Sequence, residues 1–68
     1  MSIVKVIEVI SEGKTIEDGL KAAVKEAGKT IKHIKQIDLK WVHAHVEKNK
    51  ITNFRITAKI SFVVDHKK

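Results

Sequence analysis

The chain opens with an apolar run. Residues 3–10 read IVKVIEVI, in which only Lys5 and Glu8 are charged. Such a β-branched run is typical of a strand that is buried on one face and largely covered on the other. The polar residues 11–14 that follow contain Gly13 and predict a turn.

A helical pattern begins at Thr15. Thr15 precedes Asp18 by three residues, a variant of the capping box in which a hydroxyl and a carboxylate bind backbone N–H groups. The apolar residues that follow mostly step by three or four positions, as the buried stripe of a helix does. They are Ile16, Leu20, Ala23, Val24, Ala27, Ile31 and Ile34. This spacing predicts a helix of about five turns that ends at residues 33–35.

Two segments with a period of two follow the helix. Residues 36–46 and 50–64 predict two strands, and the polar residues 47–50 between them predict a hairpin turn. A two-residue loop at Lys48 and Asn49 sets odd residues of the first strand opposite even residues of the second, and a loop one residue later gives the same parity.

This parity predicts which residues share each face of the hairpin. The face expected beneath the helix collects Ile37, Leu39, Trp41, Phe54, Ile56, Ala58, Ile60 and Phe62. The opposite face mixes polar residues with Val42, Ala44, Val46 and Val63. Because an exposed apolar patch rimmed by charges marks a contact surface, we expect another subunit or a ligand to cover that second face.

These elements predict an α+β fold in the order β-α-β-β. Right-handed crossover logic puts the first strand beside the third, which gives a three-stranded antiparallel sheet in the order 1-3-2 wrapped around one helix. The first and second strands are then sheet edges, and such edges need covering.

Length strengthens the expectation of a partner. The chain has 68 residues, which we interpret as a single domain over residues 1–68, and it contains no cysteine. Disulfides and thiolate zinc sites are therefore excluded as stabilising devices, so oligomerisation is expected. No apolar run is long enough to span a bilayer and the N-terminus lacks a leader pattern, so we expect a cytoplasmic protein.

The net charge of +6 attracts anionic partners in general. Four lysines, at positions 21, 25, 29 and 32, follow the polar face of the predicted helix. Solvation of an amphipathic helix accounts for such a stripe, and contact with phosphate or nucleic acid is the alternative. Charge alone does not choose between them.

No catalytic constellation is present in the sequence. The serines lack a nucleophile motif, the three glycines are too dispersed for a phosphate loop, and the carboxylates are scattered. We therefore expect no catalytic residues and no enzymatic activity.

Two histidines and one tryptophan have competing interpretations. His43 and His45 point to the same side of a strand and can share a cation at a subunit junction, but two ligands do not complete a site, so no metal is assigned. The alternative is a pair of partly exposed histidines. His33 is expected in the last helical turn. Trp41 is expected in the core, because the predicted parity argues against a role in stacking on a planar ligand.

Several segments together resemble the dodecin family. They are residues 4–9 (VKVIEV), Glu17-Asp18, residues 22–30 (AAVKEAGKT), residues 46–51 (VEKNKI) and residues 54–64 (FRITAKISFVV). The match covers nearly the whole chain without gaps. The resemblance implies a hollow dodecamer with helices outside and sheets inside. It also implies stacked flavins at two-fold contacts, held by a tryptophan at the start of strand two and a glutamine early in strand three.

At those two positions this chain has Gln36 and Arg55. A glutamine offers no aromatic face, whereas an arginine is a planar cation that stacks on a ring or binds phosphate. The resemblance thus predicts a ligand site at Gln36 and Arg55 at which flavin, as FMN or riboflavin, binds weakly or not at all. Trp41 cannot take the missing role unless the register of its strand flips.

Two functions follow from the sequence. The first is a non-catalytic, dodecameric cage that binds or stores a small planar or phosphate-bearing ligand. The second is a structural or polyanion-binding assembly that uses basic outer helices. Neither a membrane nor nucleic acid is the expected partner of the first.

Overall fold

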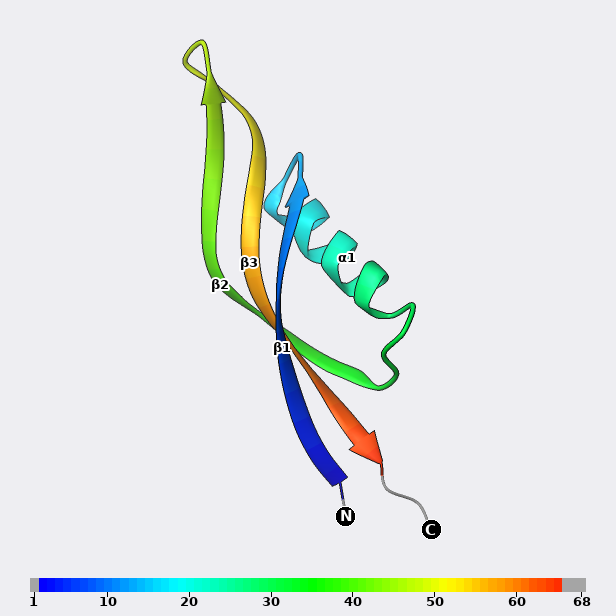
Figure 1. Ribbon diagram of the computed structural model, residues 1–68. Coiled ribbons are helices and arrows are strands. Elements are labelled where there is room, and N and C mark those ends of the chain that lie inside the picture. Colours follow the sequence, from blue (N-terminus) through cyan, green and yellow to red (C-terminus); the bar gives the residue numbers. More distant parts are fainter. Residues whose placement is uncertain (1, 66–68) are drawn as a thin grey trace.

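Four elements follow one another in the predicted order. In the computed structural model, which describes residues 2–65, β1 spans Ser2–Gly13, α1 spans Ile16–Ala27, β2 spans Ile34–Glu47 and β3 spans Lys50–Asp65. The strands form one antiparallel sheet in the order β1-β3-β2 (Figure 1). The β-α-β-β fold with the last strand in the centre is therefore confirmed, and β1 and β2 are the sheet edges.

The predicted start of the helix is also confirmed. The backbone N–H of Asp18 donates to the Thr15 hydroxyl oxygen over 3.0 Å. The turn predicted at residues 11–14 is wrong, however, because β1 continues to Gly13, which pairs with Phe54. Only Lys14 and Thr15 then connect β1 to α1, so the two elements meet at a tight corner.

The helix is shorter than predicted. It ends at Ala27, where the N–H of Gly28 still donates to the Val24 carbonyl over 2.8 Å and the carbonyl of Ala27 accepts from Ile31 over 2.9 Å. The chain then turns, and His33, with φ of 63°, lies in the loop before β2. The placement of His33 in the last helical turn is therefore wrong. Ile31 and Ile34 continued the helical spacing by coincidence, because Ile34 is already the first residue of β2.

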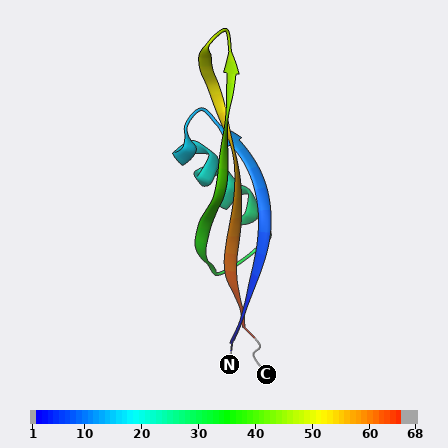
Figure 2. The ribbon, with the colours of Figure 1, turned by 90° about the vertical axis from the view of Figure 1, so that its left-hand side faces the viewer.

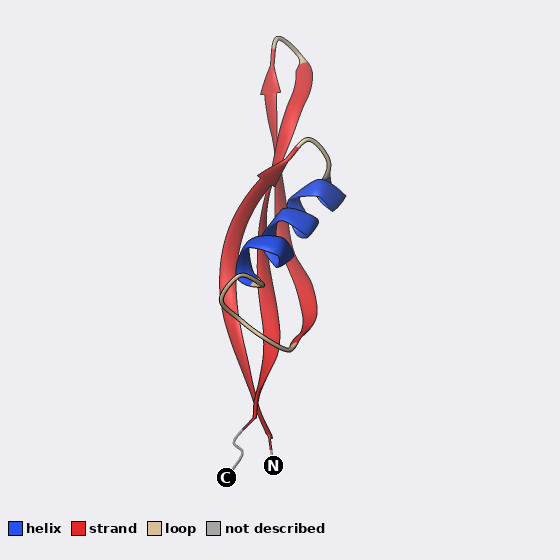
Figure 3. Ribbon diagram, turned by 90° about the vertical axis from the view of Figure 1, so that its right-hand side faces the viewer, coloured by secondary structure: helices blue, strands red, loops and turns tan. Residues whose placement is uncertain are grey.

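One face of the sheet is covered by α1, which packs mainly against β1 and β3 (Figures 2 and 3). The buried apolar side chains of the described residues are Ala23, Ile56, Ala58 and Ile60. The molecule measures 58 × 19 × 12 Å, and the β2–β3 hairpin extends beyond α1. Its radius of gyration of 14.4 Å exceeds the value of about 11 Å for a compact chain of this length. Within residues 2–65, α1 lacks both the length and the apolar character of a bilayer-spanning helix.

The hairpin turn lies at the predicted residues. Lys48 and Asn49 both have positive φ, of 52° and 64°, as a type I′ turn requires, and Glu47 pairs with Lys50. Beyond the turn the register shifts three times, with an additional residue at Thr52 in β3 and at Lys40 and Lys35 in β2. The β-bulge at Lys40 has the largest consequence for function.

The bulge at Lys40 reverses the predicted faces of half of β2. Leu39 pairs with Ala58 on the helix side, but Trp41 pairs with Thr57 on the opposite side, because an inserted residue inverts the alternation. Val42 then pairs with Ile56 on the helix side. The prediction was correct for Ile37 and Leu39. It was wrong for Trp41, Val42 and Ala44.

Candidate functional site

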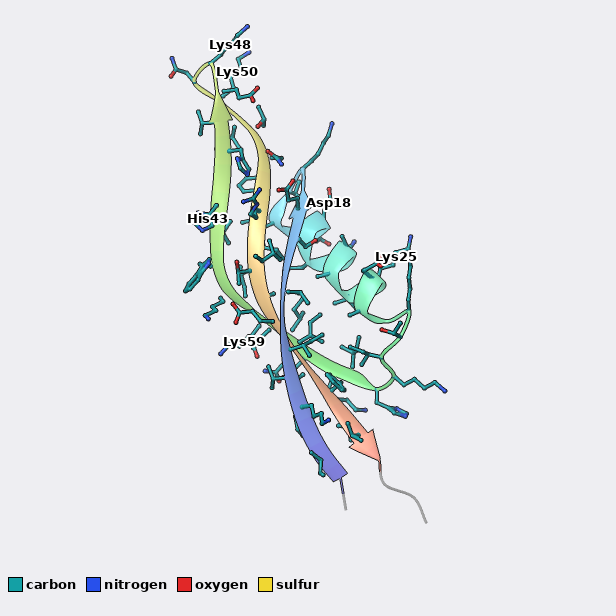
Figure 4. All side chains as sticks on the ribbon, viewed as in Figure 1. Asp18, Lys25, His43, Lys48, Lys50 and Lys59 are labelled. Atoms are coloured by element: carbon teal, nitrogen blue, oxygen red, sulfur yellow. The ribbon has the colours of Figure 1, made fainter. Side chains whose placement is uncertain are left out.

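The sheet has an open face, the face turned away from α1. Three adjacent cross-strand rows form its centre, each with one residue from β1, β3 and β2. These rows are Glu8–Lys59–Asp38, Ile10–Thr57–Trp41 and Glu12–Arg55–His43. Figure 4 shows His43 and Lys59 pointing away from α1, whereas Lys25 lies on the helix side.

Lys40 and Arg55, two cations of the open face, pair with carboxylates of the same chain. Lys40 Nζ lies 3.4 Å from the Glu8 carboxylate and 4.7 Å from the centroid of the Trp41 ring. Arg55 contacts Glu12 Oε2 through both Nε and Nη2, each over 3.0 Å. Since these side chains are partly exposed, the pairs contribute little stability, but they fix the orientation of the cations.

Apolar side chains fill the rest of the open face. Val4, Val6, Ile10 and Trp41 are 62%, 53%, 67% and 52% exposed. The half-apolar face predicted from the sequence therefore exists, but β1 supplies most of it, together with Trp41. An apolar patch bordered by charged groups is typical of a surface that binds something.

The two predicted ligand residues both lie on the open face. Gln36 pairs with Ser61, and its amide nitrogen donates to the Asp38 carboxylate over 2.9 and 3.0 Å. Arg55 is six residues from Ser61 along β3, which corresponds to about 20 Å. A single chain therefore does not bring Gln36 and Arg55 to one small ligand.

Trp41 is the residue of this face that sequence reasoning missed. It lies between Gln36 and Arg55, in the row adjacent to Arg55. The local sequence does not indicate the β-bulge that puts Trp41 there. Residues 39–41 show ordinary strand alternation and contain no Gly or Pro.

The histidine pair also lies on the open face, since His43 is opposite Arg55 and His45 opposite Asn53. The ring nitrogen Nε2 of His45 is buried without a hydrogen-bond partner. Among residues 2–65, no three His, Asp or Glu side chains come together as a metal site. The pair by itself offers two ligands, so the assignment of no metal stays a prediction.

Two apolar hollows flank α1 on the covered face. One lies against β1 and is lined by Ile7, Val9, Ala23, Ala27 and Ile31, among others. The other lies against β2, between Leu20, Val24 and Ile37. The charged groups at their margins are Glu26, Lys29, Lys21 and Lys25, of which Glu26 and Lys29 pair over 3.2 Å. These hollows present apolar walls rather than reactive groups.

Known proteins resemble the chain in both sequence and fold. The profile of the dodecin family matches residues 3–65. A variant of dodecin from Thermus thermophilus superposes with a TM-score of 0.89 at 16% identity, over 97% of this chain and 100% of that one. Dodecin from Streptomyces coelicolor gives 0.87 at 16% identity, over 97% and 96% of the two chains. Dodecin from Streptomyces davaonensis gives 0.86 at 14%, over 96% and 97%.

No curated protein sequence matches the chain. At these identities the structural likeness shows the fold, whereas the family profile covers nearly all of the sequence. The chain belongs to the dodecin family.

Proposed function

We propose that this chain is a non-catalytic protein that binds or stores a small planar or phosphate-bearing ligand and assembles into a hollow homododecamer. The observation that carries the proposal is the open face. It exposes Val4, Val6, Ile10 and Trp41 beside Arg55, and α1 lies on the other side of the sheet. A surface of this kind requires either a second copy or a ligand to cover it.

Arg55 and Gln36 are the proposed ligand-binding residues. A guanidinium has five N–H donors in a plane, and Glu12 engages only two of the three nitrogens of Arg55. The remaining capacity suits a phosphate or a carbonyl edge. Because Gln36 is about 20 Å from Arg55 along the sheet, both act on one ligand only where two copies meet.

A flavin remains the reference ligand because of the family. We expect it to bind weakly at Gln36, whose side chain cannot stack and whose amide already donates to Asp38. The non-catalytic assignment is supported by the pairing of polar groups on the open face, which form ion pairs and amide bonds rather than a nucleophile beside a base.

The polyanion-binding alternative has weaker support. Lys29 and Lys32 lie beyond the end of α1, so the basic stripe predicted from the sequence is interrupted. Lys21 pairs with Glu17 over 3.1 Å and Lys29 with Glu26 over 3.2 Å. Steeply salt-dependent retention on immobilised nucleic acid would nevertheless favour it.

Replacing Arg55 tests the proposed site. In Arg55→Ala we expect FMN binding to be lost while the assembly stays intact, because Arg55 is a partly exposed residue of the open face that forms its ion pair with Glu12 of the same chain. Titration calorimetry measures the affinity and light scattering the mass. The matched control is Lys59→Ala, because Lys59 is a second cation of β3 that faces the same way as Arg55.

Two results would reject the proposal in separate ways. Equal FMN affinity of Arg55→Ala and the parent chain rejects Arg55 as a ligand residue. A scattering mass near the 7.7 kDa of one chain rejects the assembly. A yellow colour of the purified protein would be early support.

A further inference from the structure

The only tryptophan of the chain lies in the middle of the open face. Trp41 is 52% exposed, although a tryptophan normally buries a large apolar area. The bulge at Lys40 puts it opposite Thr57 rather than beneath α1. We propose that Trp41 is the aromatic surface on which a planar ligand stacks, which rests on the proposed function and moves the stacking position from Gln36 to Trp41.

The ring of Trp41 is held in place before any ligand arrives. Lys40 Nζ lies 4.7 Å from the ring centroid and 3.4 Å from the Glu8 carboxylate, so Lys40 bridges β1 and the ring. A cation over an aromatic face is an attractive contact, and its position is fixed here by an anion on another strand. An ordered ring loses less conformational entropy when a ligand stacks on it.

The surroundings of Trp41 define the class of ligand. The neighbour across the sheet is Thr57, which is buried, and beyond it lies Ile10, which is 67% exposed. Ile10 therefore continues the apolar surface of the open face beyond Thr57. Arg55 is one row away, about 7 Å along β3. This arrangement fits a planar aromatic heterocycle that carries an anionic or carbonyl group about 7 Å from the stacked ring.

The two candidate stacking positions, Gln36 and Trp41, can be tested separately. Thr57 and Ser61, the partners of Trp41 and Gln36, are four residues apart, which is about 13 Å. A substitution at one position therefore leaves contacts at the other intact. Trp41 is also its own reporter, because its fluorescence is the only tryptophan signal of the chain.

The test is a titration of the full chain with riboflavin and with FMN, following the fluorescence of both the flavin and Trp41. We expect quenching of Trp41 by either flavin. Trp41→Leu should weaken riboflavin binding roughly 5- to 150-fold, the range for loss of one stacked aromatic contact. Trp41→Phe should retain most of the affinity, and Gln36→Leu should weaken it less than Trp41→Leu does. The control is Ile51→Ala, an exposed apolar residue beside the hairpin turn, which should change the affinity by less than about twofold. Tighter binding of FMN than of riboflavin would support recognition of the phosphate by Arg55.

Each other outcome overturns the inference. Loss of affinity in Gln36→Leu with none in Trp41→Leu overturns it and leaves the proposed function standing. Failure of the parent chain to bind either flavin overturns the inference and rejects flavin as the ligand of the proposed function. A fall of the scattering mass to that of one chain in both Trp41 variants makes Trp41 a subunit contact, which also overturns it.

Discussion

Gly13 stands where β1 meets the first turn of α1. A Cβ at this position would lie 2.6 Å from the Gly19 backbone nitrogen and 2.9 Å from the Asp18 Cβ. The nearest atom belongs to the backbone, so it cannot swing aside as a long side chain can. A glycine therefore allows β1 and α1 to approach with only two residues between them.

A pair of alanine substitutions tests this close approach. Gly13→Ala should lower the free energy of unfolding by about 1–3 kcal/mol, as overpacking does, measured by urea denaturation at a fixed chain concentration. The control is Gly19→Ala inside α1, where the new Cβ would meet Ile56 Cγ1 at an ordinary 3.4 Å. This variant should be neutral or stabilised by up to about 1 kcal/mol, because alanine favours helix. Equal stability of the two variants would contradict the close approach.

At the scale of elements, the predictable features are those with a local cause. The Thr15 cap and the hairpin turn at Lys48 and Asn49 each depend on a few neighbouring residues, and each was predicted. The end of α1 was not, because Ile31 keeps the helical spacing after the backbone has left the helix.

The candidate site was predictable only in part, for a related reason. Gln36 and Arg55 share the open face, as the alternation of side chains along β2 and β3 predicts. The position of Trp41 depends on an inserted residue whose presence is decided by pairing with β3, so no short stretch of sequence encodes it.

Deletions distinguish the inserted residue from its neighbours. Removing Lys40 should restore a regular ladder in which Leu39 still pairs with Ala58 and Trp41 with Thr57. We expect this variant to assemble and to lose less than about 1 kcal/mol of stability, the scale of an exposed ion pair. Circular dichroism during thermal unfolding and light scattering provide the measurements.

The matched deletion is His43, another exposed residue of β2. Its loss forces either Trp41 or the rest of the hairpin onto the wrong face, since a one-residue slip exchanges the two faces. We expect a melting temperature at least about 5 °C below that of the Lys40 deletion, which corresponds to roughly 1 kcal/mol in a domain of this size. If the deletion of Lys40 were the more damaging of the two, the assigned bulge would be wrong.

At the scale of the whole molecule, the core is small for the length of the sheet. Only four apolar residues are buried among those described, while the long axis reaches 58 Å. A chain of this size buries only about 60% of its unfolded surface even when compact. We therefore expect association to supply a large share of the burial that folding requires.

This coupling predicts that stability depends on protein concentration. Diluting the chain a hundredfold should lower its melting temperature and, at the same dilution, reduce its scattering mass, because a partner bound only by the folded state stabilises it by mass action. Fluorescence of Trp41 and light scattering follow the two events on one sample. A folded chain of 7.7 kDa with an unchanged melting temperature would contradict the coupling.

The edge position of β1 has a consequence for what happens when assembly fails. Its run of isoleucine and valine has only Lys5 and Glu8 as charged interruptions between residues 3 and 10, and Val4, Val6 and Ile10 are exposed. An exposed, β-branched edge strand is a template for intermolecular strand pairing. Variants that cannot assemble should therefore collect in the insoluble fraction during expression, and we expect the subunit contacts of the proposed assembly to protect the chain from aggregation.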